Sequence, residues 1–413
     1  MRPAGILIAM AIVSMIVGGC WDRREPEELI AALAIGFDID DEGLYDVVIQ
    51  YSNPSTITGA EGGGQGGSET ESGGGQTRTF WTYSAKGRTP FEAIRNLAPE
   101  VTRLTTLSHI QILLISEKLA RHGIGPIVDL YERNMELRPS VISAVVEGDL
   151  KHCLDMDLPL EIIPATGLAR LFRLIASERS MLTNGKFLDK IILLGRPGQE
   201  VTITRLQVLG ESGDQKGNGT QHTGSPSPPV RVHGGSAFRG EKMVGWLDMD
   251  ESRGWNWIMG KVRRGPMLIP VPERNSIITL DLIGSKSVVT PVIKGKDISI
   301  RLEIKACSRI EDETNLDGKI EKIDFGDPDI IRMLREGFSK DVREKTEIAL
   351  ARAKDLKADI FGFGNLVYRK HPKVWKDWAG DNWGEIFENI EVEIDIETKI
   401  SRPGLIMSPG IHH

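Results

Sequence analysis

Cysteine is scarce in this sequence of 413 residues, which has only Cys20, Cys153 and Cys307. So few and so widely spaced thiols exclude a small disulfide-rich scaffold. The eight histidines are scattered, with no H-E-x-x-H or similar ligand spacing, and no G-x-S-x-G elbow is present. Cys153 follows His152 directly, which makes an adjacent pair rather than a nucleophile and base brought together by folding. We therefore expect no catalytic residues, no cofactor and no metal site.

Basic blocks are also missing, and the formal net charge is −7. Nucleic-acid binding needs clustered cations against the phosphates, so nucleic acid is not an expected partner. After residue 20, no apolar run approaches the ~20 residues that a transmembrane helix needs. The remaining composition is that of an ordinary globular protein of two or three domains.

The first twenty residues have the layout of a bacterial export signal: Arg2, then an apolar run over 4–17, then Gly18-Gly19-Cys20. Val17-Gly18-Gly19-Cys20 resembles the lipobox of bacterial lipoproteins, in which the cysteine thiol receives a diacylglycerol before cleavage. From this layout and the lipobox we interpret 1–19 as a signal peptide and Cys20 as the lipid attachment site. We expect the diacylglycerol to anchor the protein, because two acyl chains hold a protein firmly at a membrane. An ordinary cleaved signal and an uncleaved short anchor are the alternatives.

Two segments rich in glycine lie between strand-like runs. The first, 58–77, joins runs that begin at Leu44 and Thr79, and the second, 210–229, joins runs that begin at Glu200 and Val230. Neither has the G-x-x-x-x-G-K-[ST] or G-x-G-x-x-G arrangement of a phosphate loop. Both are typical of solvated loops, because glycine and serine bury too little surface to offset ordering.

Strands and helices alternate in the first half of the chain. Thr89-Pro90-Phe91-Glu92 is a capping box with proline at the first helical position, which predicts a helix through Leu97. An apolar run from Ser108 predicts a strand, after which Ser116 caps a helix that Gly123 ends. A further strand is expected from Ser140, followed by a short helix. This order predicts a partly parallel sheet covered by helices.

A second capping box, Asp248 with Glu251, predicts a helix that stops at Gly260. Trp255 and Trp257 point about 200° apart on it, so both cannot enter one narrow core face. We favour one tryptophan buried in its own domain and the other at a domain boundary. The alternative is that one of them is a hot spot for a partner.

The last third contains an alternating strand from Lys296, a helix from Asp327-Pro328 to about Leu356 with a kink expected at Gly337, and a final strand. One face of that strand carries Glu391, Glu393, Asp395 and Glu397. Such carboxylates can hold Ca²⁺, but we favour the solvated face of an antiparallel sheet.

Three tryptophans, Trp375, Trp378 and Trp383, precede the final strand and are expected to cap the core of that sheet. Asp355 and Asp359 lie four residues apart at a lysine-rich helix end and are interpreted as surface charge. Cys153 and Cys307 are expected to be free buried thiols rather than a disulfide.

The sequence thus predicts an α+β fold of three mixed α/β domains, with sheets packed against helices. The expected parts are the N-terminal α/β domain 20–198, the middle α+β domain 199–284, the C-terminal α+β domain 285–405 and a tail, 406–413.

Four segments stand in a characteristic order: "GCWDRREPEELIAALAIGFDID", "SHIQILLISEKLARHGI", "SAFRGEKMVGWLDMDESRGWNWIMGKVRRG" and "KADIFGFGNLVYRKHPKVWKDW". In order and spacing they resemble the Ger(x)C family, the lipoprotein C subunits of spore germinant receptors. The resemblance runs from Cys20 to about Ser401. This chain departs from the family pattern in its two longer glycine-rich loops and in Trp255, where an aliphatic residue is more usual.

The resemblance implies a lipoprotein on the outer face of the cell membrane, the inner membrane of the spore, working with an A subunit and a multi-pass B subunit in nutrient-triggered germination. Only Cys20 carries over with a chemical role, and direct nutrient binding is not expected. A solute-binding lipoprotein of a transporter is the alternative, although it needs two similar lobes and the sequence has no internal repeat.

Overall fold

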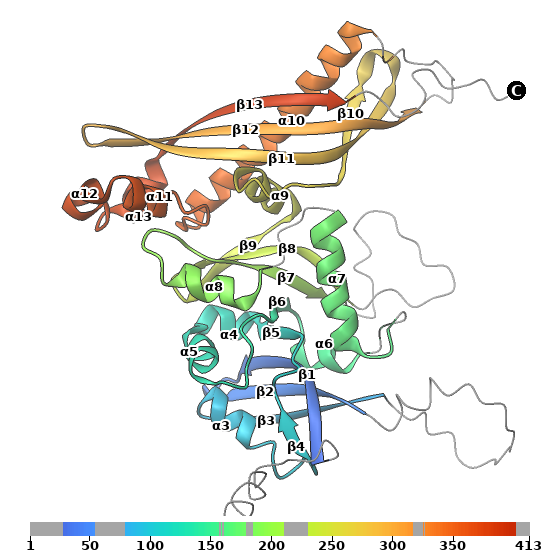
Figure 1. Ribbon diagram of the computed structural model, residues 1–413, viewed down its shortest axis with the longest axis vertical. Coiled ribbons are helices and arrows are strands. Elements are labelled where there is room, and N and C mark those ends of the chain that lie inside the picture. Colours follow the sequence, from blue (N-terminus) through green and yellow to red (C-terminus); the bar gives the residue numbers. More distant parts are fainter. Residues whose placement is uncertain are drawn as a thin grey trace, which may run out of the picture.

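The computed structural model describes residues 28–53, 79–156, 158, 161–178, 185–209, 230–316, 325 and 327–401. Two sheets follow one another along the long axis of the molecule, with helices beside and between them (Figure 1). This confirms the predicted α+β class with sheets packed against helices. The predicted signal peptide, Cys20, the loops 58–77 and 210–229 and the tail 406–413 lie outside the described residues.

The first sheet has nine strands in the order β3-β2-β1-β5-β6-β7-β8-β9, and β4 pairs with the start of β1. Parallel pairs join β1, β5, β6 and β7, whereas β1-β2-β3 and β7-β8-β9 are antiparallel. The predicted partly parallel sheet is confirmed, and the strands on either side of each glycine-rich segment, β2 with β3 and β7 with β8, are antiparallel neighbours. The strands are β1 (Leu29–Ile39), β2 (Tyr45–Ser52), β3 (Phe80–Gly87), β4 (Leu104–Thr106), β5 (Ile112–Ser116), β6 (Ile142–Glu147), β7 (Thr202–Val208), β8 (Val230–Arg239) and β9 (Lys242–Leu247).

Helices cover both faces of this sheet, so its central strands are apolar on both sides. In β1, for example, Ala34 and Ile35 belong to cores on opposite faces. One core is closed by α3 (Pro90–Arg95), α4 (Glu117–His122), α5 (Gly125–Arg133) and α8 (Phe187–Leu194). The other is closed by α6 (Leu150–Asp155) and α7 (Pro164–Glu178).

The predicted helix signals act where expected, with small differences in length. The Ser116 hydroxyl accepts the Leu119 N–H at 3.0 Å, and Gly123 ends α4 with φ of 140°. The Thr89 hydroxyl likewise accepts the Glu92 N–H, but α3 ends at Arg95, before the predicted Leu97. Strand β5 begins at Ile112 rather than Ser108, because residues 107–110 form a turn.

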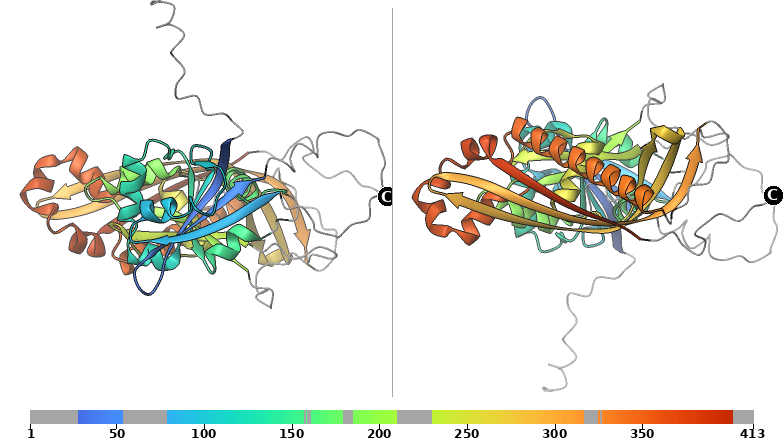
Figure 2. Two further views of the ribbon diagram at one scale, coloured as in Figure 1. Left: turned by 90° about the horizontal axis from the view of Figure 1, so that it is seen from below. Right: turned by 90° about the horizontal axis from the view of Figure 1, so that it is seen from above.

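The second sheet has the order β10-β11-β12-β13, with β10 (Pro266–Val271), β11 (Ser276–Lys294), β12 (Asp297–Asn315) and β13 (Glu391–Ser401). A 3-10 turn, η2 (Pro272–Arg274), joins β10 to β11. Strand β13 is parallel to β12, so the antiparallel expectation was wrong. The cause is α10 (Pro328–Asp355), which runs back along the sheet through Gly337 as one helix of 28 residues and returns the chain to the starting end of β12 (Figure 2).

Helix α9 (Met249–Ile258) lies between the two sheets and begins with the predicted reciprocal capping box. It packs so closely on α10 that a Cβ added at Gly254 would lie 1.9 Å from the Lys345 carbonyl oxygen. Trp255 and Trp257 are 4% and 0% exposed and share one core with both sheets, so neither is available to a partner. Burial on opposite sides of one helix is possible because every residue from 254 to 258, in the second half of α9, is buried.

The strands of the expected middle domain are divided between the sheets. Strands β7 to β9 continue the first sheet beside β6, whereas β10 and the start of β11 belong to the second. The first sheet therefore extends across the expected boundary near residue 198, and the three domain bounds stay a prediction.

Candidate functional site: the basic, tryptophan-rich end of the second sheet

Four short elements gather after α10 at one end of the second sheet, next to the turn between β11 and β12 (Figure 1). They are α11 (Phe363–Lys370), α12 (Pro372–Val374), the π-helix η3 (Trp375–Ala379) and α13 (Trp383–Asn389). The segment 368–378 within them reads YRKHPKVWKDW and is called here the basic turn.

Asp359 organises this end of the molecule, with a side chain that accepts four N–H groups. One carboxylate oxygen accepts the backbone N–H groups of Gly362 and Phe363, at 2.8 and 3.1 Å. The other accepts the N–H of Gly364 at 2.7 Å and the indole N–H of Trp383 at 3.0 Å. The loop that starts α11 is thereby closed around one carboxylate and joined to α13.

Asp359 is 3% exposed, so its interpretation as surface charge was wrong, whereas Asp355 is on the surface and pairs with Arg352 at 2.8 Å. Burial raises the pKa of Asp359 to about 6, because desolvation outweighs the four hydrogen bonds, which lower the pKa. The Asp359 carboxylate therefore holds the loop at the start of α11 in place, and N–H donors surround both of its oxygens.

Glycines allow the same loop to approach the first sheet. A Cβ at Gly198 would lie 2.4 Å from the Trp375 ring, and one at Gly364 would lie 2.5 Å from the Trp383 indole nitrogen. Asn365 donates its backbone N–H to the carbonyl of Gly198 at 2.9 Å, and the Asp359 carbonyl accepts the N–H of Glu200, also at 2.9 Å. These contacts attach the loop and Trp375 of the basic turn to residues 198–200, which lead into β7.

The three predicted tryptophans cap the core of the second sheet, as expected. Trp383 is 7% exposed, and its ring centroid lies 5.6 Å from that of Trp375. Trp378 is partly buried against the same core, and Tyr368 meets Trp375 edge-on at 6.0 Å. The π-helix η3 is closed by the backbone N–H of Gly380, which donates to the carbonyl of Trp375 at 2.8 Å.

The outer side of the basic turn carries four exposed cations, Arg369, Lys370, Lys373 and Lys376. None of these four has an ion-pair partner among the residues that the structure describes, although cations elsewhere on the second sheet, such as Arg301 and Lys305, do. Tyr368, 42% exposed, adds an aromatic surface beside them. A positive, partly aromatic and rigid surface of this kind can bind an acidic segment of another protein.

The carboxylates of β13 form the solvated face that was favoured. All four are exposed, and Glu393 and Glu397 pair with Arg301 and Lys305 of β12 at 3.1 and 2.8 Å. Within the described ranges, no three His, Cys, Asp or Glu side chains converge as metal ligands would.

The thiols have different environments. Cys153 of α6 is free and buried in the core, where burial raises its pKa to about 12 and so disfavours the reactive thiolate. Cys307 on β12 is also free but only half-buried, so its expected full burial was wrong. None of the described helices is both long and apolar enough to cross a bilayer.

Sequence reasoning missed Asp359 and the basic turn. The spacing D-x-x-G-x-G was the available signal for the first, because glycines three and five residues after an aspartate let the backbone fold around its carboxylate. The signal for the second was four cations within eight residues, 369–376, of an otherwise acidic chain. These cations do not form an uninterrupted basic block, because His, Pro, Val and Trp lie between them.

Two family models match this chain. The one described as the spore germination protein N-terminal domain matches residues 22–208, and the one described as "Spore germination B3/ GerAC like, C-terminal" matches residues 233–404. These matches include three of the four segments on which the resemblance was based and the first from Asp22 onward, so Cys20 precedes the matched range.

Two relatives and one solved structure are similar to this chain over most of its length. Spore germination protein KC of Bacillus subtilis (strain 168) is 23% identical over 417 residues, covering 100% of this chain and 98% of the relative. Spore germination protein B3 of the same strain is 22% identical over 419 residues, covering 98% and 100%. A solved structure, "Crystal Structure of the GerBC protein", has the same fold, with a TM-score of 0.52 and 17% identity over 89% of this chain and 96% of that one. The chain therefore belongs to the family of spore germination proteins that combine this N-terminal domain with the B3/GerAC-like C-terminal domain.

Proposed function

We propose that this protein acts in spore germination as the C subunit of a germinant receptor, anchored by a diacylglycerol on Cys20 to the outer face of the membrane. The observation that carries the proposal is the match of both family domains over nearly the whole chain, with relatives named as spore germination proteins. The fold of the GerBC protein over 89% of the chain supports it. In this role the protein assembles with integral-membrane A and B subunits and does not itself bind the nutrient.

The basic turn is the surface that fits this assembly role. Its cations have no partners among the described residues, and the Asp359 loop holds it in one position, so little ordering is required on binding. Charge complementarity then selects an acidic segment of a partner subunit.

Co-purification from mildly solubilised spore membranes tests the assembly. The double variant Lys373→Glu, Lys376→Glu should lose the A and B subunits, because charge reversal turns attraction into repulsion. The matched control, Arg335→Glu with Lys340→Glu on exposed positions of α10, makes the same change in net charge and should retain them. If both variants retain the subunits equally, the basic turn is not part of the interface. Absence of A and B subunits from the wild-type preparation would contradict the proposed complex.

The anchor is tested separately. Cys20→Ala should leave the protein as unprocessed precursor or release it from membranes, whereas Cys307→Ala should change neither. Mass spectrometry of the wild-type N-terminal peptide should show a diacylated Cys20, and an unmodified Cys20 in the mature protein would contradict the anchor.

A further inference from the structure

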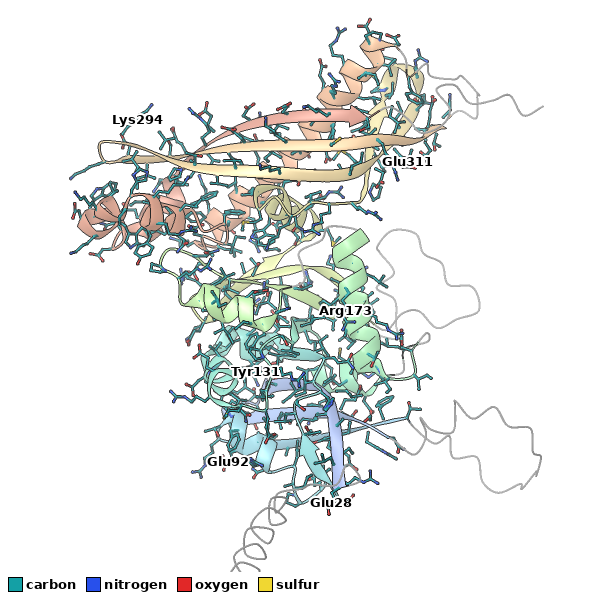
Figure 3. All side chains as sticks on the ribbon, in the orientation of Figure 1. Glu28, Glu92, Tyr131, Arg173, Lys294 and Glu311 are labelled. Carbon is teal, nitrogen blue, oxygen red and sulfur yellow. The ribbon has the colours of Figure 1, made fainter. Side chains whose placement is uncertain are left out.

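Two grooves adjoin one another on the first sheet, between α3, β4 and the end of α5. They enclose about 760 and 720 Å³ and share Phe91, Arg95, Asn134 and Glu136 in their lining. Together they form one surface, called here the α3–α5 face. It lies on the part of the molecule where the described chain begins, near Glu28 and Glu92 in Figure 3.

Apolar side chains are unusually exposed on this face. Met135 is 98% exposed, Leu104 is 51% exposed and Phe91 is 43% exposed, and all three line the grooves. Exposed apolar side chains that lie together, unlike single ones, mark a surface that contacts something else.

Arginines surround these apolar side chains. Arg88, Arg95 and Arg103 line the grooves, and no carboxylate pairs with them among the described residues, while the Arg95 guanidinium lies 5.0 Å from the centre of the Phe91 ring. Glu28 and Glu136 lie on the same face and oppose them, whereas Asp129 is neutralised by Arg133 at 2.6 Å. Apolar contact therefore supplies most of the attraction, and the arginines add a preference for phosphate groups.

The short stretch of chain between Cys20 and Glu28 indicates what the α3–α5 face contacts. Glu28 lines the second groove and follows Cys20 by eight residues, which span at most about 28 Å when fully extended. A lipid on Cys20 therefore keeps the α3–α5 face within reach of the headgroup layer. Aromatic and aliphatic side chains with arginines beside them suit the boundary between headgroups and acyl chains.

We propose that the α3–α5 face rests on the lipid bilayer, with Met135, Leu104 and Phe91 in the interfacial layer, and that the molecule stands with its second sheet away from the membrane. This orientation rests on the proposed anchoring at Cys20. The second sheet and Lys294 lie toward the opposite end of the long axis (Figure 3). The basic turn is then directed at parts of partner subunits that project from the membrane.

The test uses the full-length, lipidated chain in nanodiscs that contain equal parts of phosphatidylcholine and phosphatidylglycerol, without other subunits. A solvatochromic noncanonical amino acid replaces Met135 in one variant. In the matched control it replaces Leu268 of β10, another apolar side chain that is 60% exposed but belongs to the second sheet. The probe at 135 should shift its emission to the blue and be quenched by lipids brominated in their acyl chains. The probe at 268 should do neither.

Equal, water-like emission from both probes in disc-bound protein would overturn the orientation while leaving the anchor intact. A blue shift at 135 that requires added A or B subunits would also overturn it, because the occupant would then be a protein. If Cys20 is not lipidated, the proposed anchor fails, and a synthetic lipid coupled to Cys20 through a maleimide, in a Cys307→Ser background that removes the other accessible thiol, still tests the orientation with the same two probes.

Discussion

Asp359→Asn is the change that best tests how the loop before α11 is held in place at this end of the second sheet. The amide oxygen of Asn keeps two of the four N–H donors, but the amide N–H₂ group then faces the other two, from Gly364 and the Trp383 indole. Each orphaned buried donor costs about 1–3 kcal/mol. Relief from burying a charge offsets part of this cost, so we expect the free energy of unfolding to fall by about 2–3 kcal/mol at neutral pH.

Urea unfolding followed by tryptophan fluorescence measures this loss, because Trp383 and Trp375 report on the same region. The matched control is Asp355→Asn, four residues earlier, which removes only an exposed ion pair with Arg352 and should cost less than about 1 kcal/mol. An Asp359→Asn variant as stable as the wild type, or a control equally destabilised, would refute the reasoning that the Asp359 loop holds this end together.

Three further predictions concern pH, packing and thiols. The folded pKa of Asp359, about 6, is above the unfolded value of about 4, so its contribution to stability is greatest below pH 4 and is lost as pH rises to 6. The stability of the wild type relative to Asp359→Asn should fall over that window in urea titrations, and a rise would mean that hydrogen bonding outweighs burial. Gly254→Ala should cost about 3 kcal/mol in thermal unfolding, because its Cβ meets α10, whereas Gly384→Ala meets nothing within 4 Å and should be nearly neutral. A maleimide should label Cys307 in the native protein and Cys153 only after unfolding, and fast native labelling of both would contradict the buried environment of Cys153.

Local signals predicted much of the fold because their causes lie within a few residues. The caps at Ser116 and Asp248 need only the next turn of backbone, and the alternation in β12 needs only a solvent face and a core face. The parallel pairing of β13 was missed although a strand, a long helix and a strand in sequence already favour it. The alternation within β13 carries no information on the direction of its neighbour, which depends on that larger unit.

The candidate site was less predictable because its partners are distant in sequence. Asp359 is buried by contacts with Trp383, 24 residues later, and by Glu200, far earlier in the chain. Its spacing from Asp355 is equally typical of a solvated helix face. The cations of the basic turn were visible in the sequence, but only the structure shows that they lack ion-pair partners among the described residues.

The position of β1 has a mechanical consequence. It is the described strand closest along the chain to Cys20, the proposed lipid attachment site, yet it lies inside the sheet, paired with β2 on one side and with β5 and β4 on the other. A pull through residues 21–28, along the axis of β1, loads these ladders in shear, so many hydrogen bonds must break together rather than one after another. Because forced unfolding is governed by the height of its barrier, such a strand can transmit tension applied at its first residue to the rest of the sheet without separating from its neighbours.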